Sequence, residues 1–241
     1  MTIFLDMDLP FGALLPEAHV EPGPGGILFD AADIAVQDEV ITGWSDQSGQ
    51  WHTRPAEPNT GNAQVEVFDG RTSLHTRDGV NCGYVVEGLH LSVPVFSMAI
   101  AFAPLGRAGT VLTLNPKDGR DYLFLTEENG SAELKFRDDE APLAVPCEER
   151  GQVLLCASVR GGQLSLGVNG GLPQRRSSSS LVQAGLHDLY IGCRSDRAGI
   201  KKTLGAALIS RIWLWPDEDV FAGETYARLV HMWQKDGPDG I

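Results

Sequence analysis

Two apolar runs separated by a polar loop decide the fold: Leu189-Tyr190-Ile191-Gly192 and Leu208-Ile209-Ser210-Arg211-Ile212-Trp213-Leu214-Trp215-Pro216. Both runs hold aromatic and β-branched residues typical of strands, and Gly192 and Pro216 end them. Because alternate residues of a strand face opposite ways, the second run is apolar on both faces, with Ile209, Trp213 and Trp215 on one of them. Such a strand is covered on both sides. We therefore expect the two runs to pair with each other in the middle of a layered β structure.

The composition fits one soluble domain built from many strands. The 241 residues are 42% hydrophobic and 21% charged, with 28 Gly and 14 Pro for tight turns. The formal net charge is −13 and the 19 Lys and Arg residues are scattered, which argues against nucleic acid as a partner. No apolar stretch approaches the ~18 residues that cross a bilayer, so we expect no membrane insertion.

The cysteines and the N-terminal residues indicate a cytoplasmic origin. The four cysteines at 82, 147, 156 and 193 form no Cys-x-x-Cys pair, and Cys156 lies inside the apolar run Val153–Val159. This pattern excludes a zinc ribbon and is typical of buried free thiols, which fold in a reducing compartment. Asp6, Asp8 and Pro10 interrupt the apolar N-terminal residues, so we expect no signal peptide.

Residues 1–26 form an apolar arm rather than the start of a packed strand. Four prolines at 10, 16, 22 and 24 limit helix and ladder formation. The arm nevertheless carries large apolar side chains: Ile3, Phe4, Leu5, Phe11, Leu14 and Leu15. Disordered tails are poor in such residues, so we expect the arm to dock, either on its own domain or on a neighbouring subunit of an oligomer.

Further strand-like runs recur about every ten residues, the spacing expected of a sandwich or barrel. They are Val95–Ala103, Thr110–Leu114, Tyr122–Thr126, Ala132–Arg137, Val153–Val159 and Gln163–Val168. In the first run the large side chains share one face and the small ones the other, which predicts a central strand. We interpret the basic, serine-rich segment 174–180 as a mobile loop. Apolar residues at helical spacing from Phe221 to Trp233 predict one C-terminal helix.

Four short motifs resemble those of one superfamily. They are Asp30-Ala31-Ala32-Asp33, Trp44-Ser45-Asp46-Gln47-Ser48-Gly49, Phe68-Asp69-Gly70 and Val168-Asn169-Gly170. Together they resemble the concanavalin A-like, laminin-G-like jelly-roll domains over roughly residues 27–236. The resemblance implies an all-β, two-sheet antiparallel jelly-roll sandwich with a terminal helix on the outside of a sheet. We therefore expect an extended arm over 1–26 and a jelly-roll sandwich over 27–241.

The residues of known catalytic sites are missing from the sequence. Superfamily members that cut β-glucans place three acids at alternate positions of one strand, whereas Glu66 stands alone and Asp138, Asp139 and Glu140 fit a solvated turn. The six histidines form no metal-binding pair, and no Gly-x-Ser-x-Gly elbow occurs. Ser178 to Ser180 have no base placed beside them by the sequence. We expect no enzyme.

A calcium ion at the sandwich rim is the one cofactor that the resemblance suggests. Asp118, Asp121 and Asp196 are the loop acids that could hold it. Each has a Lys or Arg nearby, at positions 117, 120, 194 and 197, which repels the ion and pairs with the acid. We therefore expect no metal or other cofactor.

An exposed aromatic side chain with polar neighbours is the remaining device, because a sugar ring stacks on the aromatic face. Trp51, His52, Arg54 and Asn59 form the best such group, although Trp51 fits a core position equally well. Trp213 fits the core.

We expect a non-catalytic binding or adhesion module that is displayed on a larger assembly, such as the decoration, spike or tail of a phage-like virion surface. Its partners are other subunits, contacted through Phe4, Leu5, Phe11, Leu14 and Leu15, and a cell-surface glycan. A free lectin-like protein and a divergent glycoside hydrolase are the alternatives.

Overall fold

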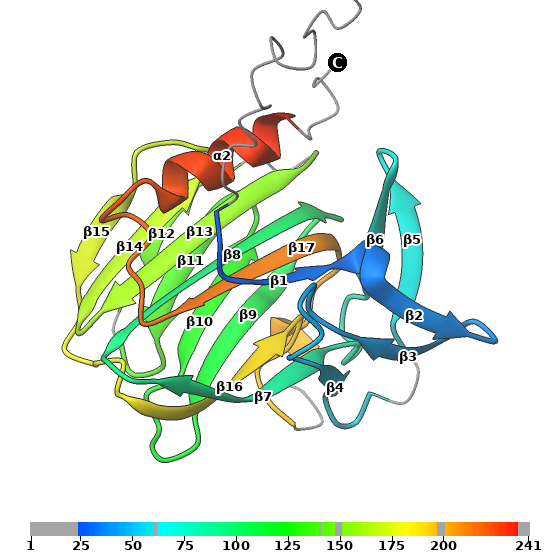
Figure 1. Ribbon diagram of the computed structural model, residues 1–241, viewed down its shortest axis with the longest axis horizontal. Coiled ribbons are helices and arrows are strands. Elements are labelled where there is room, and N and C mark those ends of the chain that lie inside the picture. The colour runs from blue at the N-terminus through cyan, green and yellow to red at the C-terminus, as the bar shows by residue number, and fades with distance from the viewer. Residues whose placement is uncertain (1–23, 60–61, 140, 148–150, 197–200, 236–241) are drawn as a thin grey trace, which may run out of the picture.

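The computed structural model describes residues 24–59, 62–139, 141–147, 151–196 and 201–235. Two large antiparallel sheets face each other and one helix packs on the outside (Figure 1). The expected all-β, two-sheet antiparallel sandwich with one C-terminal helix is therefore confirmed. The apolar residues of the arm, Phe4, Leu5, Phe11, Leu14 and Leu15, lie outside the described residues.

The first sheet has eight strands, of which β1 and β6 share one side of β17. In spatial order they are β15 (Gln174–Ser177), β14 (Gln163–Val168), β13 (Val153–Arg160), β8 (Val95–Pro104), β17 (Ala207–Pro216), β6 (Arg71–Thr76) and β5 (Gln64–Phe68), with β1 (Ile27–Asp30) beside β17. Hairpins join β5 to β6, β13 to β14 and β14 to β15.

The second sheet has seven strands: β12 (Leu143–Pro146), β11 (Ser131–Phe136), β10 (Leu123–Glu128), β9 (Gly109–Pro116), β16 (Gly185–Ile191), β7 (Tyr84–Leu91) and β4 (Thr53–Pro55). A separate two-stranded ribbon, β2 (Ile34–Gln37) and β3 (Val40–Trp44), projects from one side. Single-turn 3-10 helices occupy Ala31–Asp33 and Lys201–Thr203.

The two runs that decide the fold do not pair with each other, contrary to expectation. The first run ends β16, between β9 and β7, whereas the second forms β17, between β8 and β6 in the other sheet. The loop between them crosses from one sheet to the other. Apolar residues on both faces show that a strand is covered, but every inner strand of either sheet meets that condition, so the pattern does not identify the partner.

The core fills the space between the sheets. On β8, Phe96, Met98, Ile100 and Phe102 point into it, as the alternation predicts. A bulge between Ile209 and Arg211 shifts the register of β17. Ile209 and Ile212 therefore both face the core, although strict alternation predicts opposite faces.

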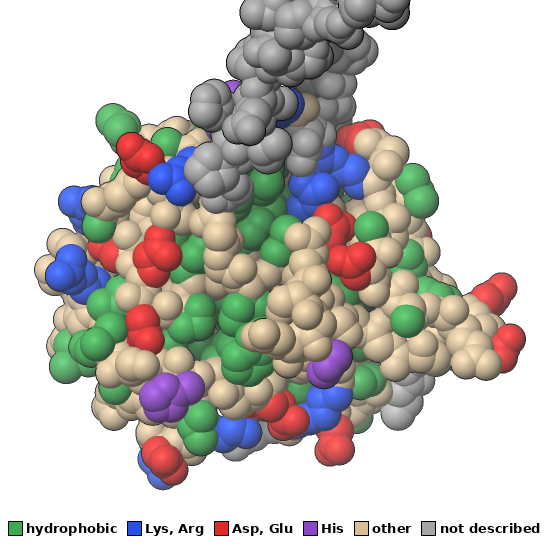
Figure 2. Space-filling model, in the orientation of Figure 1, with side chains coloured by type: hydrophobic (Ala, Val, Ile, Leu, Met, Phe, Trp, Pro, Cys, Tyr) green, Lys and Arg blue, Asp and Glu red, His purple; other side chains and the backbone are tan. Residues whose placement is uncertain are grey.

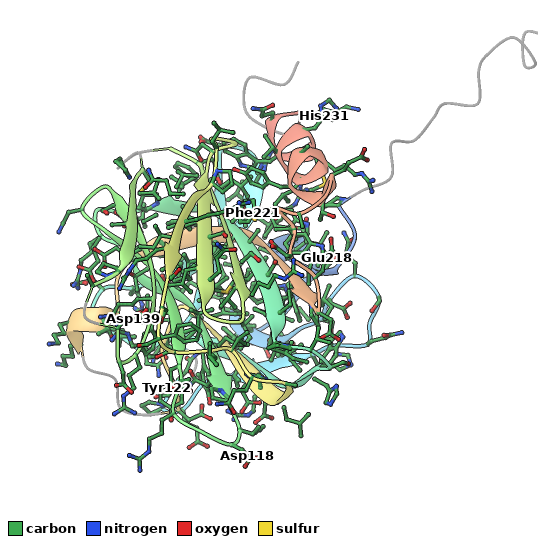
Figure 3. All side chains as sticks on the ribbon, turned by 90° about the vertical axis from the view of Figure 1, so that its left-hand side faces the viewer. Asp118, Tyr122, Asp139, Glu218, Phe221 and His231 are labelled. Carbon is green, nitrogen blue, oxygen red and sulfur yellow. The ribbon has the colours of Figure 1, made fainter. Side chains whose placement is uncertain are left out.

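Helix α2 (Thr225–Lys235) covers the outer face of the eight-stranded sheet (Figure 1). Trp213 and Trp215 point toward it and pack with Leu229. Ala99 and Ala101 of β8 belong to the same cluster, so the small face of that strand leaves room for the indole rings. Figure 3 shows Phe221 under the helix and His231 on its far side.

Segment 174–180 is not a mobile loop, because Gln174–Ser177 is the edge strand β15, paired with β14. Asp139 is 9% exposed and does not lie in a solvated turn. Its carboxylate accepts hydrogen bonds from Ser178 Oγ and from the backbone N–H of Phe136. The sequence places no acid or base beside Ser178, but in the structure Asp139 lies next to it. Asp139 connects the end of β15 to the turn after β11, near the rim of the sandwich (Figure 3).

Candidate functional site

Of the four residues of the sugar-stacking hypothesis, Trp51, His52 and Asn59 have roles that differ from that of Arg54. Trp51 is partly buried and packs against the core. His52 is exposed and its Nδ1 lies 2.7 Å from Ser45 Oγ. Asn59 is buried, and its Nδ2 donates to the carbonyl oxygen of Gly83 at 2.9 Å. These three side chains make contacts within the fold.

Arg54 lies on β4 and forms a fork with an acid that is 142 residues away. Its Nη2 donates to Asp196 Oδ2 at 2.7 Å and its Nη1 to Asp196 Oδ1 at 3.2 Å. The same Nη2 donates to Glu87 Oε1 at 2.9 Å. The hydrogen bonds that Arg54 donates to Asp196 and Glu87 raise the pKa of Arg54 and lower the pKa of both carboxyl groups, so all three are charged at neutral pH.

Two further contacts extend this group along β16. Tyr190 Oη donates to Asp196 Oδ2 at 3.2 Å, and burial raises the pKa of Tyr190 so that it remains a donor. Lys117 Nζ lies 2.8 Å from Asp188 Oδ2, and this hydrogen bond raises the pKa of Lys117. We define the Arg54 cluster as Arg54, Glu87, Lys117, Asp188, Tyr190 and Asp196.

Strand register places the cluster on the outer face of the seven-stranded sheet. Arg54 of β4 pairs with Val85, Val85 with Tyr190, and Tyr190 with Thr113, so these four side chains form one row across the sheet. The alternate residues Leu189 and Ile191 belong to the core. The row therefore points away from the core.

The segment after β16 brings Asp196 onto this face because the sheet holds it at several points. Thr113 Oγ1 donates to the Cys193 carbonyl at 3.1 Å, and Asn115 Nδ2 donates to the Arg194 carbonyl at 2.9 Å. Arg194 Nε donates to Thr110 Oγ1 at 2.9 Å, and the guanidinium lies 4.5 Å from the centre of the Phe124 ring. The carboxylate of Asp196 is thus held in place before any ligand arrives.

One buried acceptor at this site is left without a partner. Asn115 is 9% exposed, and its Oδ1 has no hydrogen-bond partner among the described residues. It pairs across the strands with Asp188 of the Arg54 cluster. A buried orphan acceptor is costly, so a donor such as a hydroxyl group or a water molecule is expected to reach it.

The cluster can bind polar groups, and its carboxyl groups Glu87 and Asp196 are poorly suited to donate a proton. The side chains of Arg54, Glu87 and Lys117 are 39%, 47% and 41% exposed, so a ligand can reach them. Arg54 lowers the pKa of both Glu87 and Asp196, whereas a general acid needs a raised one.

The acids considered for calcium do not come together. Asp196 pairs with Arg54, and Asp121 Oδ2 accepts from Gln183 Nε2 at 3.5 Å. Asp118 points away from the molecule at its lower end (Figure 3). Within the described ranges, no group of three or more His, Cys, Asp or Glu side chains is suited to a metal ion.

A cleft of about 700 Å³ lies elsewhere, beside the loop that leads into α2. Its acids serve the fold: Asp217 Oδ1 accepts from the N–H groups of Ser92 and Val93, and Asp219 Oδ1 accepts from Ser158 Oγ. Glu218, labelled in Figure 3, accepts from Thr225 Oγ1. The Arg54 cluster is therefore the better candidate site.

No family model and no curated protein matches the chain. Solved structures do. Trypanosoma rangeli sialidase in complex with sialic acid shares 15% identity over 90% of this chain and 34% of its own, with a TM-score of 0.61. The covalent intermediate of the same sialidase with 2,3-difluorosialic acid shares 14% identity over 89% and 34%, with a TM-score of 0.60.

The CBM40 domain of Ruminococcus gnavus IT-sialidase, bound to α2,3 sialyllactose, shares 15% identity over 59% of this chain and 96% of its own, with a TM-score of 0.45. The chain spans about a third of the length of the trypanosomal sialidase. At such identities the likeness of that sialidase shows a jelly-roll-like β-sandwich fold. Among the described residues, no helix is long and apolar enough to cross a membrane.

Proposed function

We propose that the chain is a non-catalytic carbohydrate-binding module of the concanavalin A-like, laminin-G-like superfamily, and that the Arg54 cluster contacts the sugar. One observation carries this proposal: half-exposed charged side chains from distant segments are organised by hydrogen bonds on one sheet face, beside the orphan acceptor Asn115 Oδ1. Sugar hydroxyls both donate and accept, and charged partners make the stronger hydrogen bonds.

The charge of the cluster favours a neutral sugar. Two cations, Arg54 and Lys117, face three carboxylates, Glu87, Asp188 and Asp196. Arg54 is already occupied by two of these carboxylates, so an acidic sugar has to displace one of them. The trypanosomal sialidase with a similar fold carries sialic acid in its solved complex, so a test panel needs both neutral and sialylated glycans.

The absence of catalysis is part of the proposal. It is supported by the lowered pKa of Glu87 and of Asp196, which leaves neither acid protonated at neutral pH. Reducing-sugar release from a panel of polysaccharides tests it directly. If sugar is released above background, and this release disappears in Glu87→Gln or Asp196→Asn, the protein is a glycoside hydrolase and the proposal is wrong.

A glycan array followed by calorimetry on the best ligand tests the binding site. Arg54→Ala and Lys117→Ala each remove a charged donor, whose hydrogen bond contributes ~1.5–3 kcal/mol, so each should weaken binding about tenfold to a hundredfold. Arg228→Ala is the matched control, because Arg228 is an exposed arginine of α2 that pairs with Glu224. If no glycan binds, or if both variants bind as well as the wild type, the cluster serves only to hold the segment after β16.

Display on a larger assembly, such as a phage-like virion surface, stays a prediction from the sequence of residues 1–26. One contact supports its geometry: Trp215 Nε1 donates to the carbonyl oxygen of Pro24 at 3.1 Å, on the α2 side of the eight-stranded sheet. Pro24 lies at the eight-stranded sheet, whereas the Arg54 cluster lies on the outer face of the seven-stranded sheet. Deleting residues 1–23 should leave glycan binding intact and abolish assembly, whereas a free lectin keeps its oligomeric state.

A further inference from the structure

A groove opens at the β5 edge of the eight-stranded sheet. It has a volume of about 380 Å³ between the β2–β3 ribbon and β5. We call it the acidic groove, and its lining residues are Val36, Glu39, Ile41, Gln64, Val65 and Glu66. Figure 2 shows Asp or Glu side chains at the projecting tip of the ribbon, beside the groove. The lining thus combines apolar side chains with two carboxylates, of which Glu66 Oε1 lies 2.6 Å from His75 Nδ1.

The edge strand at this groove has open backbone groups. Asp69 and Gly70 form a two-residue turn with positive φ, so the flanking pair Phe68 and Arg71 is hydrogen-bonded. Pairs alternate along an antiparallel ladder, which leaves the N–H and C=O groups of Val65 and Val67 pointing to the open edge. No proline or lysine protects β5, and Val67 is 74% exposed.

The opposite edge of the same sheet carries complementary features. Leu172, in the turn between β14 and β15, is 94% exposed, the largest value among the described large hydrophobic side chains. Tyr226 Oη donates to the Gly171 carbonyl at 2.9 Å and so ties this turn to α2. Arg175, exposed on β15, has no ion pair within the described ranges. The β14–β15 hairpin therefore presents an exposed apolar side chain, Leu172, which we call the knob, together with the cation Arg175.

We propose that copies of this chain associate head to tail, with Leu172 of one copy inserted in the acidic groove of the next and Arg175 facing Glu39 and Glu66. The two surfaces lie at the two ends of the strand order β15 to β5, so one molecule cannot join its own. A two-fold β5-to-β5 contact is disfavoured because it brings the two acidic grooves together. Different surfaces on the two partners make a heterologous contact, which grows as a chain or closes as a ring.

The acidic groove also disfavours residues 1–23 as its occupant. That segment holds Asp6, Asp8, Glu17 and Glu21 and no Lys or Arg. This segment is therefore negatively charged, and Glu39 and Glu66 repel it. A second copy carrying Leu172 and Arg175 supplies both the apolar contact and the cation.

Sedimentation velocity of the full chain over a range of protein and salt concentrations tests the proposal. Mass should rise with protein concentration and fall with salt, because the contact includes exposed charges. Leu172→Asp on the knob and Val36→Lys in the groove should each give a monomer. Leu105→Asp is the matched control, because Leu105 is 44% exposed in another turn and should associate like the wild type.

Mixing the two defective chains identifies the geometry. Leu172→Asp keeps an intact groove and Val36→Lys keeps an intact knob, so a one-to-one mixture should form a dimer and nothing larger. Melting temperatures equal to the wild type confirm that both variants are folded. The proposal is overturned if the wild type stays monomeric at its highest soluble concentration. It is also overturned if association survives both variants, or if the mixture stays monomeric.

Discussion

The two tryptophans on the outer face of β17 allow a sharp test of how the helix is held. Trp213 and Trp215 are 1% and 2% exposed and belong to the same cluster under α2. They differ at the indole nitrogen. Trp215 Nε1 donates to the Pro24 carbonyl, whereas Trp213 Nε1 has no partner among the described residues. Replacing each by Ala and by Phe separates the packing of the ring from its hydrogen bond.

The magnitudes follow from the burial. A buried Trp removes about 150–250 Å² from water, or ~4–6 kcal/mol at ~25 cal/mol per Å², and Ala recovers part of it. Removing the unpaired N–H of Trp213 relieves a cost of ~1–3 kcal/mol, so Trp213→Ala should lower the free energy of unfolding by ~3 kcal/mol. Trp213→Phe should cost less. Trp215→Phe should cost ~2–4 kcal/mol more than Trp213→Phe, because it loses a made hydrogen bond of ~1 kcal/mol and gains no relief from removing an unpaired N–H.

Urea unfolding followed by far-UV circular dichroism measures all four variants, and an unchanged slope shows that the comparison is valid. Far-UV signal is used because each substitution removes one of the five tryptophans and so changes the fluorescence itself. If Trp213→Phe costs as much as Trp215→Phe, the indole N–H of Trp213 has a partner and the reasoning is wrong. If Trp213→Ala unfolds like the wild type, the ring does not hold α2 on the sheet.

Three further predictions follow. Burial lowers the pKa of His187 below its ordinary value of 6.5, so the unfolded chain binds more protons than the folded chain below that pH. The free energy of unfolding should therefore fall as pH drops through about 6.5, and it should fall less steeply in His187→Asn. Urea unfolding at a series of pH values measures both. A Cβ on Gly205 would lie 2.3 Å from the Arg107 carbonyl oxygen, so Gly205→Ala should lower the free energy of unfolding by about 3 kcal/mol or more. Gly223 has nothing within 4 Å of such a Cβ, so Gly223→Ala should change that free energy by no more than ~0.5 kcal/mol. Equal melting temperatures of the two variants would contradict this. Burial raises the pKa of Cys156, and that of Cys193 to about 12, so in native protein a maleimide should modify the half-buried Cys147 first and the other thiols only on unfolding, as peptide mass mapping would show.

Strands with strict alternation could be predicted, and strands with irregularities could not. On β8 every second residue from Phe96 to Phe102 faces the core, so the pattern gave both the strand and its faces. The bulge at Ser210 leaves no mark in the sequence, because Ile209 and Ile212 are equally suited to either face. The partner of β17 was also beyond the pattern, since burial on two sides is common to the inner strands of both sheets.

The edge strand β15 illustrates a different limit. Its residues, Gln174 to Ser177, are polar and lack β propensity, so composition favoured a loop. The Val168-Asn169-Gly170 turn before it nevertheless signals a hairpin, and a hairpin requires a second strand. Pairing with β14 decides the structure here, and local propensity does not.

The candidate site was predicted only in part. The sequence places Arg54 close to Trp51, but its partners Asp196 and Glu87 come from 142 and 33 residues away, a proximity that only the folded sheet creates. In the sequence Asp196 stands two residues after Arg194, which favours that arginine as its partner. That arginine instead bonds Thr110 and stacks on Phe124, which leaves Asp196 to Arg54.

The site and one irregularity of the fold depend on each other. On β7, Val86 pairs with Leu189 and Leu89 with His187, so Glu87 and Gly88 together oppose the single residue Asp188. Such a bulge leaves a backbone group without its ladder partner, and Asp188 Oδ1 accepts the N–H of Gly88 at 2.9 Å. The extra residue also lets Glu87 face outward to Arg54 while Leu89 returns to the core. Without the bulge, strict alternation after Glu87 would turn Leu89 to the surface. By accepting the Gly88 N–H, the carboxylate of Asp188 therefore stabilises the bulge that the Arg54 cluster needs.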